Sequence, residues 1–384
     1  MKAGIFLVIS VFLIAYGGLH YYIYKKAILV FSSGHWLILT LLGILVVAPI
    51  LTELLTHASL ARLAVPIGRI GYTWMGFAFL FFSFSILLDC YQLFVKAGGR
   101  LLGVDASAIT FSPFSSALAT AALAVLATGY GFFAARQVNV EWMRISSHKL
   151  DKMSEPFRIV QISDLHLSLF SDETFLNRLV ETIQSIHPDV VVSTGDLVDM
   201  RQDHLDRFAD ILNGLNPKFG QYAVSGNHEA YLGLGKALAA TRRAGFTMLS
   251  HQGVKVGGMI NIVGVDDPGV SHRLKADGPE ERALLERFPE GEFTVLLKHQ
   301  PVVDRASVPF FDLQLSGHTH GGQIFPFNWL TKLAYPAKTG LSQVGRETWL
   351  YVSRGTGTWG PPIRFLAPPE VTVFELAPDT PSGS

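Results

Sequence analysis

Five short segments in the second half of the chain combine residue types that bind metal ions and transfer protons. Each contains carboxylates, imidazoles or a side-chain amide, and none contains a cysteine. Oxygen and nitrogen ligands of this kind suit Mn²⁺, Fe or Zn²⁺ and argue against a thiolate structural site. The segments are Asp164-Leu165-His166, Gly195-Asp196-Leu197-Val198-Asp199, Gly226-Asn227-His228-Glu229, Lys298-His299-Gln300-Pro301 and Gly317-His318-Thr319-His320-Gly321-Gly322.

The spacing within two of these segments predicts that their side chains act in pairs. Asp164 and His166 are two residues apart, as are His318 and His320. In an extended chain such residues point the same way, so we expect each pair to hold one ion. The whole donor set exceeds the needs of one ion, which indicates two divalent ions, with Asp196 as the bridging carboxylate. Two ions about 3.5–4 Å apart favour in-line attack of hydroxide on phosphorus. The candidate ligands are Asp164, His166, Asp196, Asn227, His299, His318 and His320.

Apolar runs precede all five segments and predict the strands that position them. Helical spacing of apolar residues occurs between several of these runs, for example over 172–186, 205–215 and 234–244. Strands that alternate with helices indicate an α/β fold, in which ligand sites gather at the carboxyl ends of strands. The predicted strands are Phe157–Ile162, Val190–Val192, Tyr222–Val224, Ile260–Val265, Phe293–Leu297, Leu313–Leu315, Trp349–Val352 and Val371–Leu376.

The first third of the chain has a different composition, which is compatible with a lipid bilayer. Residues 1–135 hold 10 charged residues, whereas the remaining 249 residues hold 52. A membrane-spanning helix needs about 20 mostly apolar residues. The four stretches that qualify are Ala3–Ile23, Trp36–Leu55, Tyr72–Phe94 and Phe114–Phe133. The sequence therefore predicts an all-α transmembrane domain with four spans.

Four spans place both ends of this domain on one side of an inner or plasma membrane. Seven basic residues fall on the side of the termini and four on the other side, which favours a cytoplasmic C-terminal domain. Asp89 lies inside the third stretch, where an acid is either functional or close enough to the headgroups to reach them. The seven are Lys2, Arg62, Arg69, Arg136, Arg144, Lys149 and Lys152; the four are Lys25, Lys26, Lys96 and Arg100.

The five segments, in this order over about 150–325, resemble the motifs of the calcineurin-like metallophosphoesterases. The string from Gly317 to Ile324 is similar to the bacterial membrane-anchored branch. So is the tail Ser353-Arg354-Gly355-Thr356-Gly357, followed by Gly360-Pro361-Pro362. The resemblance implies a two-sheet β-sandwich flanked by helices, with a dimetal site at strand ends. It says less about the four apolar stretches.

The resemblance also implies individual roles. His228 would be the general acid or transition-state donor, oriented by Asp199. The cofactors would be two divalent ions, with Mn²⁺ favoured and Fe or Zn²⁺ as alternatives. One ion would be bound by Asp164, His166, Asp196 and His320, and the other by Asp196, Asn227, His299 and His318.

The predicted domains are a transmembrane domain over 1–135, a linker over 136–156, a metallophosphoesterase domain over 157–379 and a tail over 380–384. The expected activity is hydrolysis of a phosphodiester or pyrophosphate at the bilayer. Similar membrane enzymes act on UDP-2,3-diacylglucosamine, which makes a lipid precursor the leading substrate. Residues 136–384 carry 24 basic and 28 acidic residues, which disfavours nucleic acid.

Two alternative functions remain open from the sequence. The first is a membrane sensor or transporter-like protein whose phosphoesterase domain binds a nucleotide without turnover. The second is a membrane scaffold with a vestigial phosphoesterase fold, which would bind no metal. A separate question concerns apolar residues that follow the last metal segment, which form either a lip that reaches toward lipid or ordinary packing. These residues are Ile324, Phe325, Phe327, Trp329 and Leu330.

Overall fold

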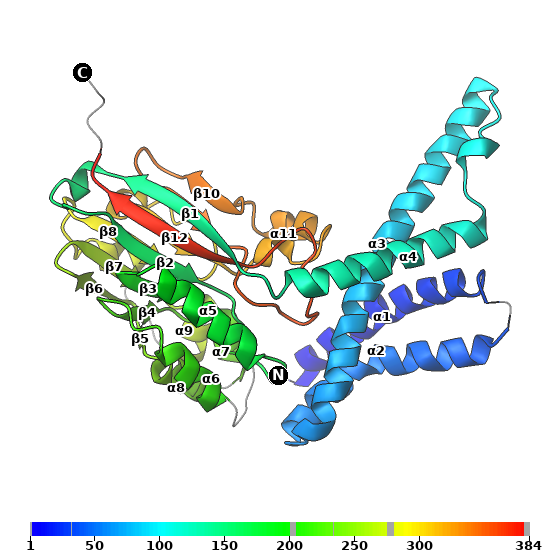
Figure 1. The fold of residues 1–384 in the computed structure, drawn as a ribbon, viewed down its shortest axis with the longest axis horizontal. Coiled ribbons are helices and arrows are strands. Elements are labelled where there is room, and N and C mark those ends of the chain that lie inside the picture. The colour runs from blue at the N-terminus through cyan, green and yellow to red at the C-terminus, as the bar shows by residue number, and fades with distance from the viewer. Residues whose placement is uncertain (1, 32, 200–204, 233, 275–279, 380–384) are drawn as a thin grey trace. The chain divides into compact units, whose positions relative to one another are not determined.

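The computed structural model describes residues 2–31, 33–199, 205–232, 234–274 and 280–379. The chain divides into two compact units. The helical unit contains Met1–Phe133 together with the short segment Gly360–Phe365, and the α/β unit contains Ala134–Trp359 and Leu366–Ser384. Their elements are labelled in Figure 1. Each unit therefore has its own packing and is considered by itself.

Long apolar helices make up the helical unit. Among the described residues, three segments are long and apolar enough to cross a membrane, namely His35–His57, Ala61–Leu102 and Ser107–Ala134. The predicted span Ala3–Ile23 falls within a further helix and stays a prediction. The elements are α1 (Lys2–Ala27), α2 (His35–His57), α3 (Ala61–Leu102), η1 (Ser107–Ile109) and α4 (Pro113–Ala134).

Helix α3 is much longer than the stretch that predicted it. It has 42 residues and includes Arg62 and Arg100, which the sequence placed outside the span. Asp89 of this helix accepts hydrogen bonds from Lys26 Nζ of α1 at 2.7 and 2.8 Å and from Tyr22 Oη at 2.7 Å. A carboxylate held by a cation and a hydroxyl is far less costly among apolar helices than a lone charge.

The segment Gly360–Phe365 packs within the helical unit although it lies near the C-terminus in sequence. A Cβ at Gly76 would lie 2.4 Å from Cδ1 of Ile363 and 3.2 Å from Cβ of Pro361, so the glycine lets this segment pack closely against α3. The Arg364 backbone N–H donates to the Gly131 carbonyl of α4 at 2.9 Å. The Phe365 ring meets Phe84 and Tyr130 edge-on, at centroid distances of 6.1 and 6.2 Å. A distant segment thus completes the packing of the helices.

Two mixed six-stranded sheets form the α/β unit, in the orders β1-β12-β2-β3-β4-β5 and β10-β11-β9-β8-β7-β6. The strands are β1 (Asn139–Ser146), β2 (Phe157–Ile162), β3 (Val190–Ser193), β4 (Gln221–Ala223), β5 (Phe246–Met248), β6 (Gln252–Val256), β7 (Ile260–Gly264), β8 (Phe293–Leu297), β9 (Leu313–Ser316), β10 (Gly340–Gln343), β11 (Trp349–Val352) and β12 (Glu370–Ala377). The α-helices are α5 (Glu173–Ser185), α6 (Leu205–Asn213), α7 (Asn227–Leu232), α8 (Leu234–Arg243), α9 (Pro268–Leu274), α10 (Glu281–Leu285) and α11 (Asn328–Ala334).

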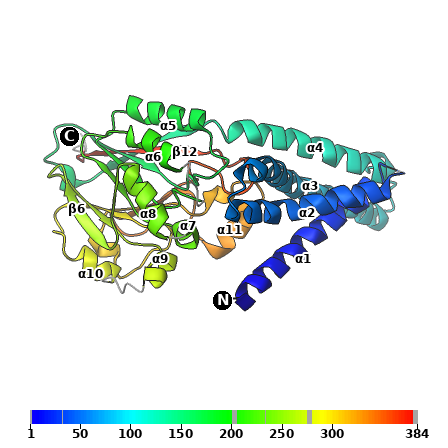
Figure 2. The same cartoon turned by 90° about the horizontal axis from the view of Figure 1, so that it is seen from below.

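The two sheets pack face to face, and helices cover their outer faces. Alternate residues of one strand serve different layers, because successive side chains point to opposite faces. Ile159 of β2 joins a core shared with β8 and β9 of the other sheet, whereas Val160 packs with α5 and α6. In Figure 2, α5 and α6 lie on one side of the sheets, and α9 and α10 lie on the other. Both faces of the central strands are therefore buried, which explains why the sequences of these strands are mostly apolar.

The predicted fold class is confirmed, but several elements were not foreseen. The predicted linker 136–156 contains β1, which pairs in parallel with β12 over eight residues, so residues 139–146 of this segment belong to the first sheet. The interpretation as a linker failed because β1 is an edge strand with only one buried residue, Ile145. The strands β5, β6 and β10 and the short helices α7, α9, α10 and α11 were also not predicted.

Candidate metal centre

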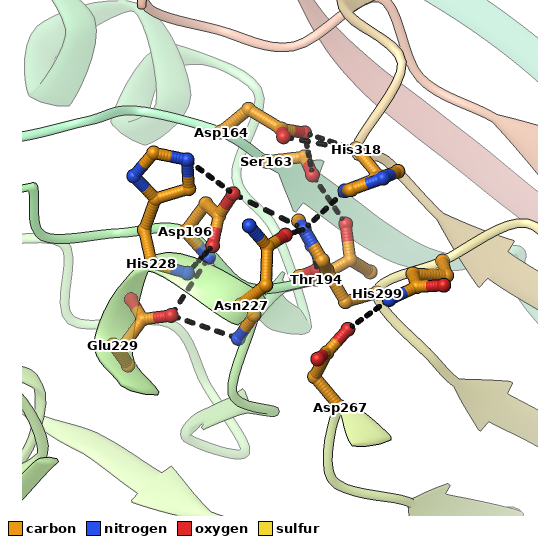
Figure 3. A network of polar contacts seen from close by, with 12 residues as sticks. Ser163, Asp164, Thr194, Asp196, Asn227, His228, Glu229, Asp267, His299 and His318 are labelled. Carbon is orange, nitrogen blue, oxygen red and sulfur yellow. Dashed lines mark hydrogen bonds and ion pairs between the residues drawn. The ribbon is translucent and has the colours of Figure 1, made fainter. Parts of the chain in front are cut away.

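The candidate ligands come from loops at the carboxyl ends of five strands. Strands β2, β3 and β4 of the first sheet lead to Asp164, Asp196 and Asn227, and strands β8 and β9 of the second lead to His299 and His318. The two sheets thus bring residues together that are up to 156 positions apart, from Asp164 to His320 (320 − 164). Figure 3 shows Asp196 beside Asn227 and His228.

The backbone at this centre turns sharply, contrary to the extended conformation expected from the i, i+2 spacing. Asp164 and His166 have φ values of 51° and 49°, and Asp196, His318 and His320 have 50°, 72° and 52°. Left-handed conformations of non-glycine residues cost about 1–3 kcal/mol each and gather at functional sites. Hydrogen bonds hold them here, because the Asp164 and His166 amides donate to the Gly195 and Asp196 carbonyls, both at 3.0 Å.

Two glycines let the loops approach closely. A Cβ at Gly226 would lie 2.1 Å from Asp196 Oδ1, and a Cβ at Gly317 would lie 2.2 Å from Asp164 Oδ2. Real Cβ atoms do not come this close to other heavy atoms, so any larger residue would displace a carboxylate. These glycines therefore occur in the segments because the neighbouring loop occupies their side-chain space.

The first group of converging donors consists of Asp164, His166 and His320, whose donor atoms lie within 4.8 Å of one another. The Nε2 atoms of His166 and His320 are 2.9 Å apart, and His320 Nε2 is 3.4 Å from Asp164 Oδ1. All three residues are buried. This group draws its carboxylate and one imidazole from the first sheet and its second imidazole from the other sheet.

The second group consists of Asp196, His299 and His318, with Asn227 beside it. His299 Nε2 lies 3.1 Å from Asp196 Oδ2, from Asn227 Oδ1 and from His318 Nδ1. His318 and His320 thus belong to different groups, so the expectation that this pair holds one ion was wrong. The left-handed turn at both residues separates their side chains.

These donor sets fit divalent cations. Ligand atoms about 2.1 Å from one ion lie about 3.0 Å apart in octahedral and about 3.4 Å apart in tetrahedral coordination, as several of these pairs do. The outer nitrogens are already engaged: His299 Nδ1–H donates to the Thr194 carbonyl at 2.8 Å, and His318 Nε2 hydrogen-bonds the Tyr335 hydroxyl at 2.9 Å. Such partners fix the ring orientation and leave the inner nitrogen free for a metal.

His228 lies at the edge of the centre and is paired with Asp199. Its Nδ1 is 2.5 Å from Asp199 Oδ1, and its Nε2 is 4.0 Å from Asp196 Oδ2. It also forms a third donor group with His166 and Asp196. The exposed rings of Tyr231 and Trp359 meet the His228 ring edge-on, with centroids 5.6 and 5.5 Å away. The Nδ1–carboxylate pair orients the ring so that Nε2 faces the centre.

The electrostatics of the metal-free centre are dominated by one ion pair. Burial alone would raise the pKa of Asp196, but His299, followed by His166 and His228, holds it well below its ordinary value. Burial opposes protonation of His299, yet Asp196 raises its pKa to about 10. Burial likewise opposes protonation of His228, and the hydrogen bond to Asp199 raises its pKa above the ordinary value. The pair with Asp199 therefore favours the protonated form of His228.

Glu229 is a buried residue to which the sequence assigned no role. Its carboxylate accepts backbone N–H bonds from Leu197 and Gly226 at 2.8 Å and from Asp196 and Val198 at 3.2 Å. Burial, together with nearby Asp196, raises its pKa to about 7. Glu229 thus connects the loop of Asp196 to the loop of Asn227 (Figure 3). Glu229 is next to His228 in the third segment, and this position in the sequence could have identified it as part of the site.

Comparison with known proteins identifies the family of this chain. The family profile described as Calcineurin-like phosphoesterase matches residues 157–322. A metallophosphoesterase of Aquifex aeolicus is 35% identical over 258 residues, which cover 66% of this chain and 97% of that protein. A protein of Bos taurus described as a transmembrane protein with metallophosphoesterase domain is 30% identical over 332 residues, covering 80% of this chain and 74% of its own length. A crystal structure of a dimetal phosphatase from Danio rerio has 14% identity and a TM-score of 0.34, and the match covers 53% of this chain and 88% of that one.

A metal-dependent phosphoester hydrolase is the class that this fold and this donor set define. The chain belongs to the calcineurin-like metallophosphoesterases. Its long apolar helices indicate that this member is associated with a membrane.

Proposed function

We propose that the chain is a multi-pass membrane phosphoesterase that hydrolyses a phosphodiester or pyrophosphate of a membrane-resident substrate. The observation that carries this proposal is the convergence of carboxylate, amide and imidazole donors from both sheets beside the His228–Asp199 pair. Two divalent ions held there, Mn²⁺ first and Fe or Zn²⁺ otherwise, would polarise the phosphoryl oxygens and lower the pKa of a water between them.

The protein's own residues supply the remaining chemistry. The first group, with Asp196, would hold one ion, and Asp196, Asn227, His299 and His318 would hold the other. His228 would donate a proton from Nε2 to the leaving oxygen, and Asp199 would keep the ring oriented and favour its charged form. Tyr231 and Trp359 would flank the leaving group beside that nitrogen.

The substrate class follows from the membrane helices. An enzyme fixed to a surface meets substrates of the same surface at high effective concentration, whereas a soluble nucleotide gains nothing comparable. A diacylated nucleotide pyrophosphate such as UDP-2,3-diacylglucosamine combines a cytoplasmic phosphate with acyl chains. The seven-to-four distribution of basic residues supports a cytoplasmic active site.

The activity is tested with the full-length protein in proteoliposomes. We expect two divalent ions per chain by elemental analysis and Mn²⁺-stimulated hydrolysis of bis-p-nitrophenyl phosphate. Binding of a nucleotide without turnover of any phosphoester would favour the sensor or transporter alternative. The orientation is tested separately with a reporter fused after Ser384, and a reporter active only outside the cytoplasm would refute it.

A further inference from the structure

The short helix α11 exposes an unusual amount of apolar surface next to the metal centre. Trp329, Leu330 and Leu333 are 62%, 55% and 83% exposed, and Phe327, which precedes the helix, is 44% exposed. Of the predicted lip, only Ile324 is buried. Contiguous apolar side chains on a surface mark a binding site for an apolar partner. We therefore expect an apolar molecule to cover this helix.

Helix α11 is fixed to the metal centre at both ends. At its start, a Cβ on Gly322 would lie 2.4 Å from the Asn328 backbone, so the helix sits directly on the last metal segment. Just after its end, the Tyr335 hydroxyl hydrogen-bonds His318 Nε2 at 2.9 Å and Gln300 Oε1 at 3.3 Å. The position of the helix is therefore tied to the position of a candidate ligand.

A pocket of about 200 Å³ lies between this helix and the centre. His318, a candidate ligand, lines the pocket together with Thr319. Its other wall is mostly apolar and comes from the helix and its flanks, namely Phe327, Leu330, Thr331, Ala334 and Tyr335. A molecule that occupies this pocket would place an apolar group on α11 and a polar group at the metal centre.

The charge around α11 points to the same kind of molecule. The sequence has no acidic residue from Leu313 to Arg346. Helix α11 itself carries Lys332, which is exposed. An apolar surface that carries tryptophan and lysine suits the interface of an anionic bilayer. A lipid is therefore a better occupant than a soluble anion, which would need no apolar wall.

We propose that α11 and its pocket bind the hydrocarbon chain of an amphiphilic phosphoester while its phosphate lies at the metal centre. This proposal rests on the phosphoesterase activity proposed above and adds the path by which a lipid substrate reaches the ions. Phe327 and Leu330 line the pocket and would contact the first part of the chain, and Trp329 and Leu333 would continue the apolar surface toward the bilayer.

The test compares two substrates with the same leaving group in the same proteoliposomes. One is soluble bis-p-nitrophenyl phosphate, and the other is p-nitrophenyl hexadecyl phosphate, which partitions into the vesicles. We expect the full-length protein to prefer the hexadecyl diester. Leu330→Asn should lower kcat/KM for that substrate by about tenfold or more, because it removes the burial of a leucine-sized contact, and should change the soluble diester less than about twofold.

Matched tryptophan variants provide the control. Trp329→Ala should cause a selective loss on the hexadecyl diester, whereas Trp142→Ala, at a residue that is 50% exposed on β1, should not. Equal losses on both substrates, unchanged hexadecyl turnover in both α11 variants, or the same selective loss in Trp142→Ala would overturn the proposal. Hydrolysis of neither substrate by the unmodified protein would instead refute the proposed function.

Discussion

The two sheets of the α/β unit contribute different chemistry to one centre. Loops of the first sheet supply both carboxylates, the amide and the His228–Asp199 pair, whereas loops of the second sheet supply only imidazoles, His299, His318 and His320. Each of the two main donor groups contains residues of both sheets. The carboxylates thus come from the first sheet, which also supplies the imidazole of His166, whereas the other three candidate imidazole ligands come from the second sheet. The centre consequently requires both sheets to be packed together, and substitutions in the two sheets should have unequal effects.

The largest effect is expected from Asp196→Ala in the first sheet. This carboxylate lies beside His299 at 3.1 Å and within 4.0 Å of both His166 and His228, so its loss should empty both ion sites and abolish turnover. Elemental analysis of the purified variant measures this. Two tightly bound ions per chain in the variant would refute the bridging role.

A second-sheet substitution should remove one ion only. His320 belongs to the first donor group and His299 to the second, so His320→Ala and His299→Ala should each retain about one ion per chain. Metal titration of the two variants checks this, with the unmodified protein as the reference. If either variant lost both ions, the two sites would not be separable by sheet.

His228→Ala should separate proton transfer from metal binding. General acids contribute about 10²–10⁴-fold to turnover, so kcat should fall by this factor while both ions remain bound. The measurement pairs steady-state kinetics with metal content. Because His228 also lies in a donor group with His166 and Asp196, a loss of metal as complete as in His320→Ala would make it a ligand instead.

Glu229→Gln should weaken metal binding without removing a ligand. The Glu229 carboxylate accepts hydrogen bonds from backbone N–H groups through both of its oxygens. In glutamine one of these oxygens is replaced by an NH₂ group, which cannot accept them. The loops of Asp196 and Asn227 should therefore be held less firmly. Outer-shell changes of this kind typically cost about 10–100-fold in metal affinity, and excess Mn²⁺ should restore turnover.

Asp312→Asn is the matched control for this change. Asp312 is also buried, accepts the Thr294 N–H at 2.8 Å and pairs with Lys149 at 2.8 Å, but it precedes β9 and so lies at the opposite end of that strand from His318. It should lower thermal stability and leave metal affinity unchanged. Equal loss of metal affinity in both variants would show that Glu229 acts only through overall stability.

Metal affinity should also depend on pH, without any substitution. In the metal-free protein the pKa of His299 is raised to about 10 by Asp196, so at neutral pH an incoming ion must displace a proton. Affinity at this site should rise by up to about tenfold per pH unit between pH 7 and 9 and level off above the pKa. Competition titrations with a chelator measure this, and an affinity that does not change with pH would contradict the shift.

The sequence predicted those parts of the fold in which local pattern and tertiary packing agree. Phe157–Ile162, Phe293–Leu297 and Trp349–Val352 match β2, β8 and β11 residue for residue, because buried central strands consist of apolar runs that end at polar loops. Edge strands β1 and β10 have mostly exposed or half-buried side chains and no such pattern. Their positions depend on the strands beside them, β12 and β11.

The candidate site shows the same limit on a smaller scale. Residue types and order identified the donors, but the left-handed turns at His318 and His320 depend on contacts with other loops. The His318 N–H, for example, donates to both carboxylate oxygens of Asp164 at 3.0 Å. The role of Glu229 likewise appears only when two loops meet. The spacing of residues along the chain does not report contacts between distant loops. It therefore could not show that His318 and His320 belong to different donor groups.

The segment Gly360–Phe365 has a consequence for the order of synthesis. Its packing against Gly76 and Gly131 belongs to the helical unit, yet Gly360 lies 227 positions after Phe133 (360 − 133). At about 5–20 residues per second, the ribosome needs roughly 10 to 45 s to cover that distance. During this time the helices lack the residues that fill the space beside these two glycines. The helical unit can therefore reach its final packing only after nearly the whole α/β sequence has left the ribosome.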